Sequence, residues 1–229
     1  MMRINEIFGP TIQGEGPHAG QYCGFLRFAE CNLSCSWCDT PYTWDWQHYD
    51  RSVESREMTL EEVADAVTAL NCYRVVLTGG EPMMQQRFFP ELYQETGCLF
   101  DVETNGTIAP VTHALDAVDL FVVSPKLGHS GDPDKKRIKP LVLDAYSALA
   151  REGKAVFKWV CQSVEDIRLV GEYCDEYAMP RTHTWIMPEG ANRSAHLENL
   201  VNLADATIEH GFNLSTRLHV LAWNDKRGV

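Results

Sequence analysis

The chain has 229 residues, of which 45% are hydrophobic, and a formal net charge of -12 at pH 7. This length is enough for one large domain and short for two, so we expect a single domain over residues 1–229. The acidic balance excludes a broad nucleic-acid-binding surface, which needs clustered Lys and Arg side chains. At the start of the chain, MMRINE lacks the apolar core of a signal peptide, and no later stretch approaches membrane-spanning length. We therefore expect a cytoplasmic protein with no membrane partner.

Short apolar runs rich in β-branched and aromatic residues alternate along the chain with amphipathic segments of helical period, which is typical of repeated βα units. Strands are predicted near residues 25–28, 74–77, 99–102, 120–123, 156–160 and 184–187. Helices are predicted from a capping box at Thr59 and near residues 88–94, 141–151, 164–174 and 196–210, followed by an extended segment over 213–221. Six such strands predict an α/β fold with a mostly parallel sheet, forming a partial, shortened (β/α)6-type barrel.

Polar strings that contain glycine or cysteine follow the predicted strands. Cys31 follows the first strand, Gly80 the second, Asn105 the third and Ser124 the fourth. Because the carboxyl ends of parallel strands meet at one edge of a sheet, we expect these residues to share a site.

Three cysteines follow the first strand at spacing C-x3-C-x2-C, namely Cys31, Cys35 and Cys38, with Trp37 just before the last. A cubane iron–sulfur cluster is normally held by four thiolates. A loop that offers three leaves one iron open to a small ligand.

A structural zinc site is the alternative for these cysteines, with Cys23, His18 or His48 as the fourth ligand. Zinc ribbons and fingers usually carry two pairs of ligands, and no second pair follows here. The remaining cysteines stand singly in apolar or helical surroundings, where free cysteine usually packs as a small hydrophobe. They are Cys72, Cys98, Cys161 and Cys174.

The cysteine string resembles the C-x3-C-x-aromatic-C motif of the radical S-adenosylmethionine (SAM) superfamily, and TGGEP at residues 78–82 is similar to its GGEP motif. The resemblance implies a [4Fe-4S] cluster on Cys31, Cys35 and Cys38, SAM on the open iron, and a radical generated by the cofactor without a catalytic side chain. It also implies SAM contacts from Trp37, Gly80, Glu81, Asn105, Ser124 and Lys126.

Within this superfamily, IFGPTIQGEG at residues 7–16 resembles the 7-carboxy-7-deazaguanine synthases, and the match extends to LHVL at 218–221. The resemblance implies a homodimer that converts 6-carboxy-5,6,7,8-tetrahydropterin to 7-carboxy-7-deazaguanine with release of ammonia, in queuosine-type 7-deazapurine biosynthesis. It further implies a flavodoxin-type electron donor and a Mg²⁺ ion bound by Thr40. The implied pterin ligands are Gln13, Glu15, Arg27, Thr78 and His219.

Two features depart from this picture or stay open. The family often has Gln where this chain has Arg217, so the added cation either retunes a carboxylate contact or faces solvent. The basic string at residues 135–137, with Lys139, is predicted to be a solvated loop.

An activating enzyme for a glycyl-radical protein remains an alternative function, because it would share the cysteines and GGEP without needing residues 13–16 or His219. The second alternative function is a non-catalytic zinc or iron–sulfur module.

Overall fold

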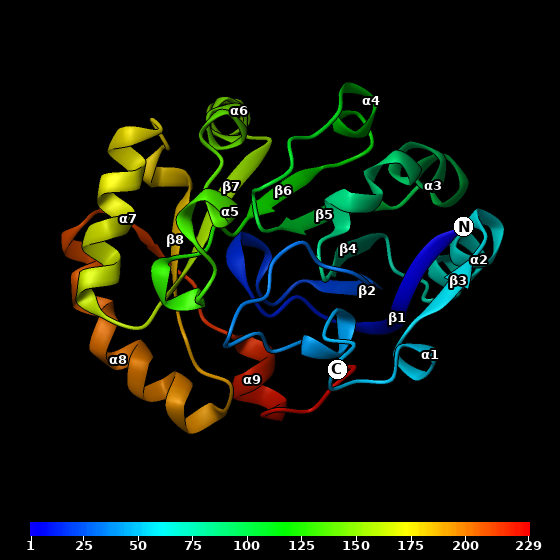
Figure 1. Cartoon of the computed structure of the whole chain (residues 1–229), viewed down its shortest axis with the longest axis horizontal. Helices are drawn as coiled ribbons and strands as arrows, with labels where there is room; N and C mark the ends of the chain where they lie inside the picture. The colour runs from blue at the N-terminus through cyan, green and yellow to red at the C-terminus, as the bar shows by residue number, and fades with distance from the viewer.

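The computed structural model describes residues 1–229, and its strands form one nine-stranded sheet in the order β3-β1-β2-β4-β5-β6-β7-β8-β9 (Figure 1). The strands are β1 (Met2–Ile12), β2 (Tyr22–Phe28), β3 (Arg56–Met58), β4 (Arg74–Gly79), β5 (Leu99–Thr104), β6 (Leu120–Val123), β7 (Ala155–Cys161), β8 (Thr184–Pro188) and β9 (Asn213–Leu214). The six predicted strands are confirmed as β2, β4, β5, β6, β7 and β8, which pair in parallel in chain order. The predicted α/β fold is therefore confirmed.

Strands β1 and β3 were not predicted from the sequence. Both pair antiparallel at the edge next to β2. In β1 the alternation of buried Met2 and Ile4 with polar residues lasts for only four positions, and the register with β2 shifts twice. Its extended form thus depends on long-range pairing, which a local pattern does not reveal.

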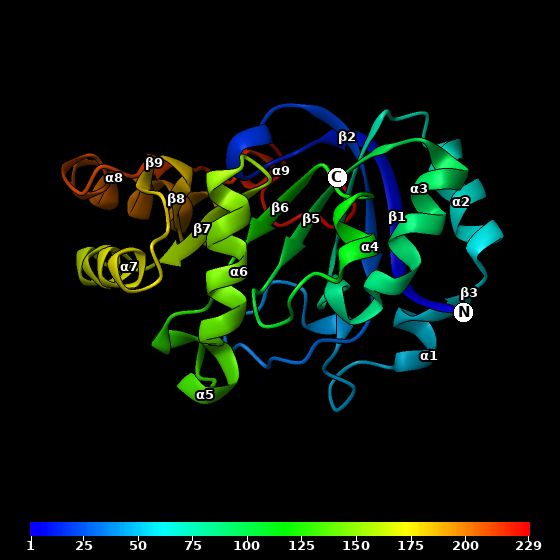
Figure 2. The ribbon, with the colours of Figure 1, turned by 90° about the horizontal axis from the view of Figure 1, so that it is seen from above.

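The predicted helices correspond to α2 (Leu60–Ala69), α3 (Phe89–Thr96), α6 (Pro140–Arg151), α7 (Val164–Glu176) and α8 (Arg193–Glu209). The capping box is confirmed, since Thr59 Oγ1 accepts from the Glu62 backbone N–H while the Glu62 carboxylate accepts from that of Thr59. These helices lie on the outer side of the curved sheet (Figures 1 and 2). Shorter elements connect them: α1 (Arg51–Glu54), α4 (Thr112–Leu115), α5 (Asp134–Arg137), and 3-10 turns η1 (Gly16–His18), η2 (Pro41–Thr43), η3 (Pro82–Phe88), η4 (Gly128–Ser130) and η5 (Arg181–His183).

The prediction of an extended segment over residues 213–221 is wrong beyond β9. A helix, α9 (Leu218–Trp223), begins where the extended segment was expected to continue. The backbone N–H of Leu218 donates to the carbonyl of Gly14 over 2.8 Å, and Val220 is buried. Packing against the N-terminal segment therefore fixes a helix that six residues alone would not keep.

The two faces of the sheet carry different chemistry because side chains alternate along each strand. On β5, Phe100 and Val102 join the large apolar core under the helices, while Glu103 lies on the inner face. On β7, Phe157 belongs to the same core and Lys158 lies on the inner face. The inner face thus brings buried polar side chains together at one end of the barrel.

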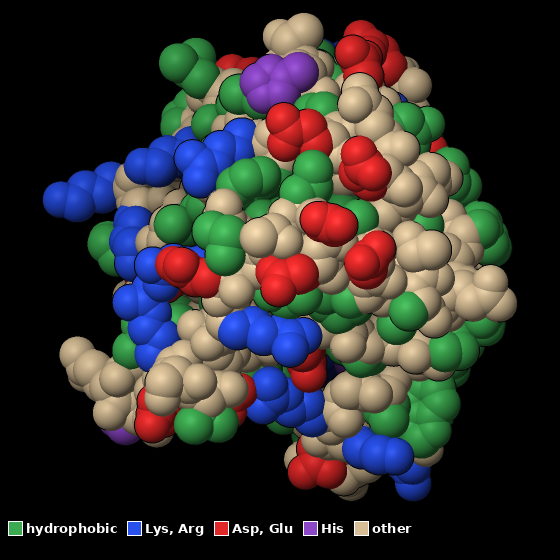
Figure 3. Space-filling model, turned by 90° about the vertical axis from the view of Figure 1, so that its right-hand side faces the viewer, with side chains coloured by type: hydrophobic (Ala, Val, Ile, Leu, Met, Phe, Trp, Pro, Cys, Tyr) green, Lys and Arg blue, Asp and Glu red, His purple; other side chains and the backbone are tan.

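The molecular surface over α2, α3 and β3 mixes acidic, basic and apolar side chains (Figure 3). Lys and Arg side chains gather along its left edge in that view, which is the side that faces the viewer in Figure 1. None of the helices combines the length and apolar character needed to cross a membrane.

Candidate cofactor and substrate site

A cavity of about 250 Å³ opens at the carboxyl ends of the parallel strands. It brings together residues that the sequence spreads from position 8 to position 229. Every predicted site residue except Glu81 lines it: Gln13, Glu15, Arg27, Cys31, Cys35, Cys38, Trp37, Thr40, Thr78, Gly80, Asn105, Ser124, Lys126 and His219. The expectation that strand-end motifs share one site is therefore confirmed.

Hydrogen bonds to residues 130–132 hold the loop that carries the three cysteines. The Ser34 backbone N–H and hydroxyl donate to the Asp132 carboxylate over 2.8 and 3.0 Å. The Ser36 backbone N–H donates to the carbonyl of Ser130 over 2.9 Å. Burial raises the pKa of the Cys31 thiol to about 12. Cys31 is therefore the most deeply set thiol of a loop whose Ser34 and Ser36 remain exposed.

A closed zinc site does not fit these residues. Cys23 packs in an apolar cluster with Phe25, while His18 bonds the Asp101 carboxylate and His48 bonds that of Asp45. None of the three candidate fourth ligands lines the cavity. Three separated thiols at an open cavity suit a cluster with an exposed iron better than a single tetrahedral ion.

The glycines after β4 allow their turn to pack against the start of the cysteine loop. Gly79 has φ +129°, and a Cβ atom on Gly80 would lie 2.0 Å from the carbonyl oxygen of Glu30. A side chain at Gly80 would thus push the turn away from the loop, and one at Gly79 would clash with the Phe28 backbone at the end of β2.

The carboxylate of Glu81 points into the protein and does not line the cavity. It is completely buried and accepts hydrogen bonds from the backbone N–H groups of Met83 and Asn105 and from the Thr104 hydroxyl, over 2.7 to 2.9 Å. Burial raises its pKa despite these donors. Its side chain connects the ends of β4 and β5. Next to it, Gly80 lines the cavity.

The predicted SAM residues Trp37, Ser124 and Lys126 lie together on one side of the cavity. Lys126 Nζ is 2.9 Å from the Ser124 hydroxyl and 5.6 Å from the centre of the Trp37 ring, and it forms no ion pair with a carboxylate. The Trp37 indole N–H is buried and has no partner. A free ammonium beside an aromatic face and an unused donor fit a ligand that combines a carboxylate with a nitrogen heterocycle.

The prediction that the basic string at residues 135–137 is a solvated loop is wrong. It forms α5, and Arg137 is buried with Nη1 donating to the carbonyl of Lys126 over 2.5 Å. Lys136 pairs with Asp132, the anchor of the cysteine loop, over 2.7 Å. The local density of charge suggested exposure, but Lys136 and Arg137 contact residues that hold or line the site.

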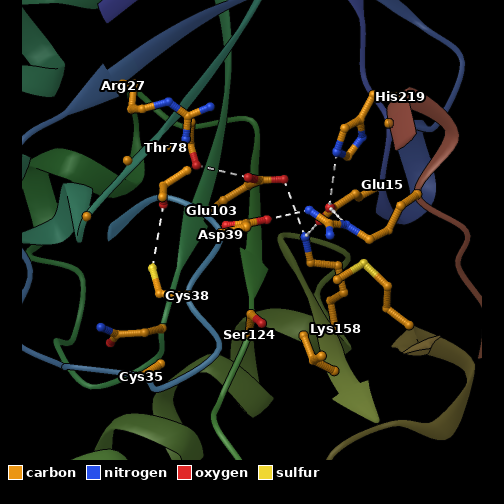
Figure 4. A pocket seen from close by; sticks show the side chains of 18 of the residues that line it. Glu15, Arg27, Cys35, Cys38, Asp39, Thr78, Glu103, Ser124, Lys158 and His219 are labelled. Atoms are coloured by element: carbon orange, nitrogen blue, oxygen red, sulfur yellow. Dashed lines mark hydrogen bonds and ion pairs between the residues drawn. The ribbon is translucent and has the colours of Figure 1, made fainter. Parts of the chain in front are cut away.

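Glu103 lies at the centre of the opposite side (Figure 4). Its carboxylate accepts from the Thr78 hydroxyl over 3.0 Å and from Gln13 Nε2 over 3.3 Å, and Lys158 Nζ is 3.5 Å away. Neither Glu103 nor Lys158 was predicted as a site residue. Their alternation with core residues on β5 and β7 was the available signal, because a charged residue inside an apolar strand needs a partner.

Glu15 is held between two cations. Its carboxylate contacts Lys158 Nζ and lies 2.9 Å from Arg217 Nε, with His219 Nε2 at 3.9 Å. Burial opposes its ionisation, but Lys158 and Arg217 together hold its pKa well below the ordinary value. Arg217 also pairs with Asp39 and donates to the carbonyl of Gly190 over 3.0 Å. The added cation therefore faces the site and not the solvent.

His219 and Arg27 complete this side. A Cβ atom on Gly14 would lie 1.8 Å from His219 Nδ1, so only glycine allows the imidazole to occupy this place. Burial lowers the His219 pKa, which keeps the ring neutral at pH 7 although Glu15 is near. Arg27 Nε donates to Glu6 over 2.8 Å, and its guanidinium lines the cavity.

Comparisons with known proteins agree with this arrangement. The family model of the radical SAM superfamily matches residues 27–171. The 7-carboxy-7-deazaguanine synthase of Pyrobaculum aerophilum is 34% identical over 99% of this chain and 97% of its own length. That of Hyperthermus butylicus is 32% identical over 96% and 92%, and that of Bacillus subtilis is 30% identical over 99% and 98%.

A solved structure shares the fold. The crystal structure of QueE from Escherichia coli superposes with a TM-score of 0.68 and 22% sequence identity, covering 95% of this chain and 94% of the other. The shortened barrel is thus a fold already seen in another protein.

Proposed function

Because the chain belongs to the radical SAM superfamily and, within it, to the 7-carboxy-7-deazaguanine synthase family, we propose that it converts 6-carboxy-5,6,7,8-tetrahydropterin to 7-carboxy-7-deazaguanine with release of ammonia. It is a radical SAM enzyme of 7-deazapurine biosynthesis. One observation carries the proposed substrate: the side chains of Glu15, Glu103 and Arg27 line the same cavity as the three cysteines.

The cofactor side of the cavity suits a [4Fe-4S] cluster and SAM. The thiols of Cys31, Cys35 and Cys38 would hold the cluster, and Trp37 and Lys126 would hold SAM through its adenine and carboxylate. When bound and reduced by one electron, this pair supplies the chemistry of hydrogen-atom abstraction. The protein orients the substrate toward it and excludes water.

The substrate side suits a pterin that carries a carboxylate. The amino-pyrimidine edge of a pterin is rich in N–H donors, and the carboxyl groups of Glu15 and Glu103 offer acceptor oxygens. Arg27 presents a planar fork that matches a carboxylate. The neutral ring of His219 can accept or donate one hydrogen bond without adding charge.

We assign Thr40 as the protein ligand of Mg²⁺. Its side chain lines the cavity next to the cluster loop, with Oγ1 3.7 Å from Cys38 Sγ. Mg²⁺ keeps several waters and often takes one or two protein ligands plus substrate oxygens. In such a site the substrate carboxylate would complete the coordination of Mg²⁺.

The resemblance to the family further supports a cytoplasmic homodimer of one domain per chain. In this proposal the electron comes from a flavodoxin-type carrier, and no nucleic acid or membrane takes part.

Product formation tests the proposal. The anaerobically reconstituted and dithionite-reduced protein is incubated with SAM, Mg²⁺ and 6-carboxytetrahydropterin, and 7-carboxy-7-deazaguanine is measured by mass spectrometry. We expect product from the wild type and from Glu91→Gln, an exposed control on α3, and a large loss in Glu103→Gln with SAM cleavage retained. Cleavage of SAM without product in the wild type would contradict the pterin assignment. A colourless protein with one zinc per chain would contradict the cluster.

A further inference from the structure

Trp44 lies beside one of the cluster cysteines although the sequence motif does not include it. Its indole Nε1–H donates to Cys38 Sγ over 3.4 Å. The side chain is half-buried and lines the cavity. This contact between a side-chain donor and a cysteine sulfur joins residues six positions apart, on either side of Thr40.

The backbone fixes the indole in this position. The Trp44 N–H donates to the carbonyl of Pro41 over 3.1 Å, which closes the η2 turn. Thr43 is fully buried, and its hydroxyl donates to the carbonyl of Thr40 over 2.8 Å. The carbonyl of Thr43 accepts from the Glu30 N–H over 2.8 Å, directly before Cys31. The turn that carries Trp44 is therefore tied to both ends of the cysteine loop.

We propose that the Trp44 N–H raises the reduction potential of the cluster by hydrogen bonding to the Cys38 thiolate. Reduction adds one electron to the cluster and increases the negative charge on its sulfur ligands. A donor aimed at one of these sulfurs stabilises the reduced form more than the oxidised form, and such hydrogen bonds are one of the factors that set cluster potentials. The inference rests on the proposed cluster ligands.

The chain contains a matched control for this contact two residues away. Trp46 is also half-buried, but its Nε1 donates to the Glu30 carboxylate over 3.3 Å. The Trp37 indole N–H has no partner. Three indoles thus lie near the cysteine loop, and only the Trp44 N–H donates to a sulfur atom.

A redox titration followed by electron paramagnetic resonance tests the proposal on the full-length, reconstituted protein. Iron and sulfide contents are measured first, and dithionite with mediator dyes sets the solution potential. In Trp44→Phe we expect the ratio of reduced to oxidised cluster at a fixed potential to fall by roughly two- to tenfold, where tenfold corresponds to about 59 mV for one electron. Trp46→Phe should titrate like the wild type.

An unchanged midpoint potential in fully loaded Trp44→Phe would overturn the proposal, and so would an equal shift in Trp46→Phe. If Trp44→Phe does not load its cluster, 3-benzothienylalanine at position 44 keeps the shape of the indole without its N–H, and the same lowered ratio is expected. The titration uses neither SAM nor pterin. A failure of the proposed reaction with an intact cluster would therefore leave this result unaffected.

Discussion

Glu15 and Arg217, which are 202 positions apart in the chain, form a buried ion pair with Arg217 Nε 2.9 Å from Glu15 Oε1. Their side chains are 13% and 11% exposed. The same guanidinium also pairs with Asp39, the residue that follows Cys38 in the cysteine loop. One cation thus connects the proposed pterin acceptor with the cysteine loop, so the two halves of the site are positioned relative to each other.

Replacing this cation should weaken pterin binding and leave the cluster in place. In Arg217→Gln, Glu15 keeps Lys158 as a partner but loses the group that fixes its second side. We expect the KM for 6-carboxytetrahydropterin to rise roughly tenfold, about 1.4 kcal/mol, with iron content and pterin-independent SAM cleavage unchanged. Arg168→Gln removes only exposed ion pairs and should behave as wild type. An unaltered KM in Arg217→Gln would refute a positioning role.

Glu81→Gln should destabilise the cluster-free protein. The carboxylate accepts from three donors, and an amide would turn N–H groups toward at least one of them. We expect the free energy of unfolding in urea to fall by about 2 kcal/mol, against no measurable change for the exposed Glu91→Gln. Wild-type stability combined with lost SAM binding would instead mean that the Glu81 carboxylate acts on SAM directly.

Stability should decrease as the pH falls below about 6.5 because of His219. Burial lowers its pKa in the folded protein, and burial and Arg217 lower that of His196. The unfolded chain, whose histidines titrate near 6.5, then binds more protons than the folded chain, so acid favours unfolding in this window. Glu15, whose lowered pKa lies under 4.5, adds its own loss only at lower pH.

The contribution of His219 can be separated by mutation. Between pH 7 and 5.5, His219→Gln should show a smaller decrease in Tm than the wild type, while the exposed control His113→Gln should keep the full decrease. Identical curves for wild type and His219→Gln would show that His219 does not have the lowered pKa.

Thr40→Ala should keep the cluster and lose much of the response to Mg²⁺. The substitution removes the proposed ligand oxygen and leaves the Cys38 thiol unchanged. Activity measured against Mg²⁺ concentration should need several-fold more metal in Thr40→Ala, whereas Thr40→Ser, which keeps a hydroxyl, should resemble the wild type. The same Mg²⁺ curve for Thr40→Ala and wild type would remove Thr40 from the site.

Local pattern identified the parallel half of the sheet and its helices because buried βα units have strong, regular signals. It failed for β1 and α9, whose conformations depend on partners far along the chain. Sequence position also places Glu81 at a strand end without giving the direction of its side chain, which points into the protein.

The sequence by itself determined the family and the cofactor motif, because both motifs are defined by residue types at fixed spacing along the chain. Only the tertiary structure decided which charges meet. Glu103, Lys158 and Arg217 look like isolated ions in the sequence, yet they lie in one cavity where low solvent exposure makes each need an opposite charge. The indole of Trp44 likewise has a role only because the η2 turn brings it to Cys38.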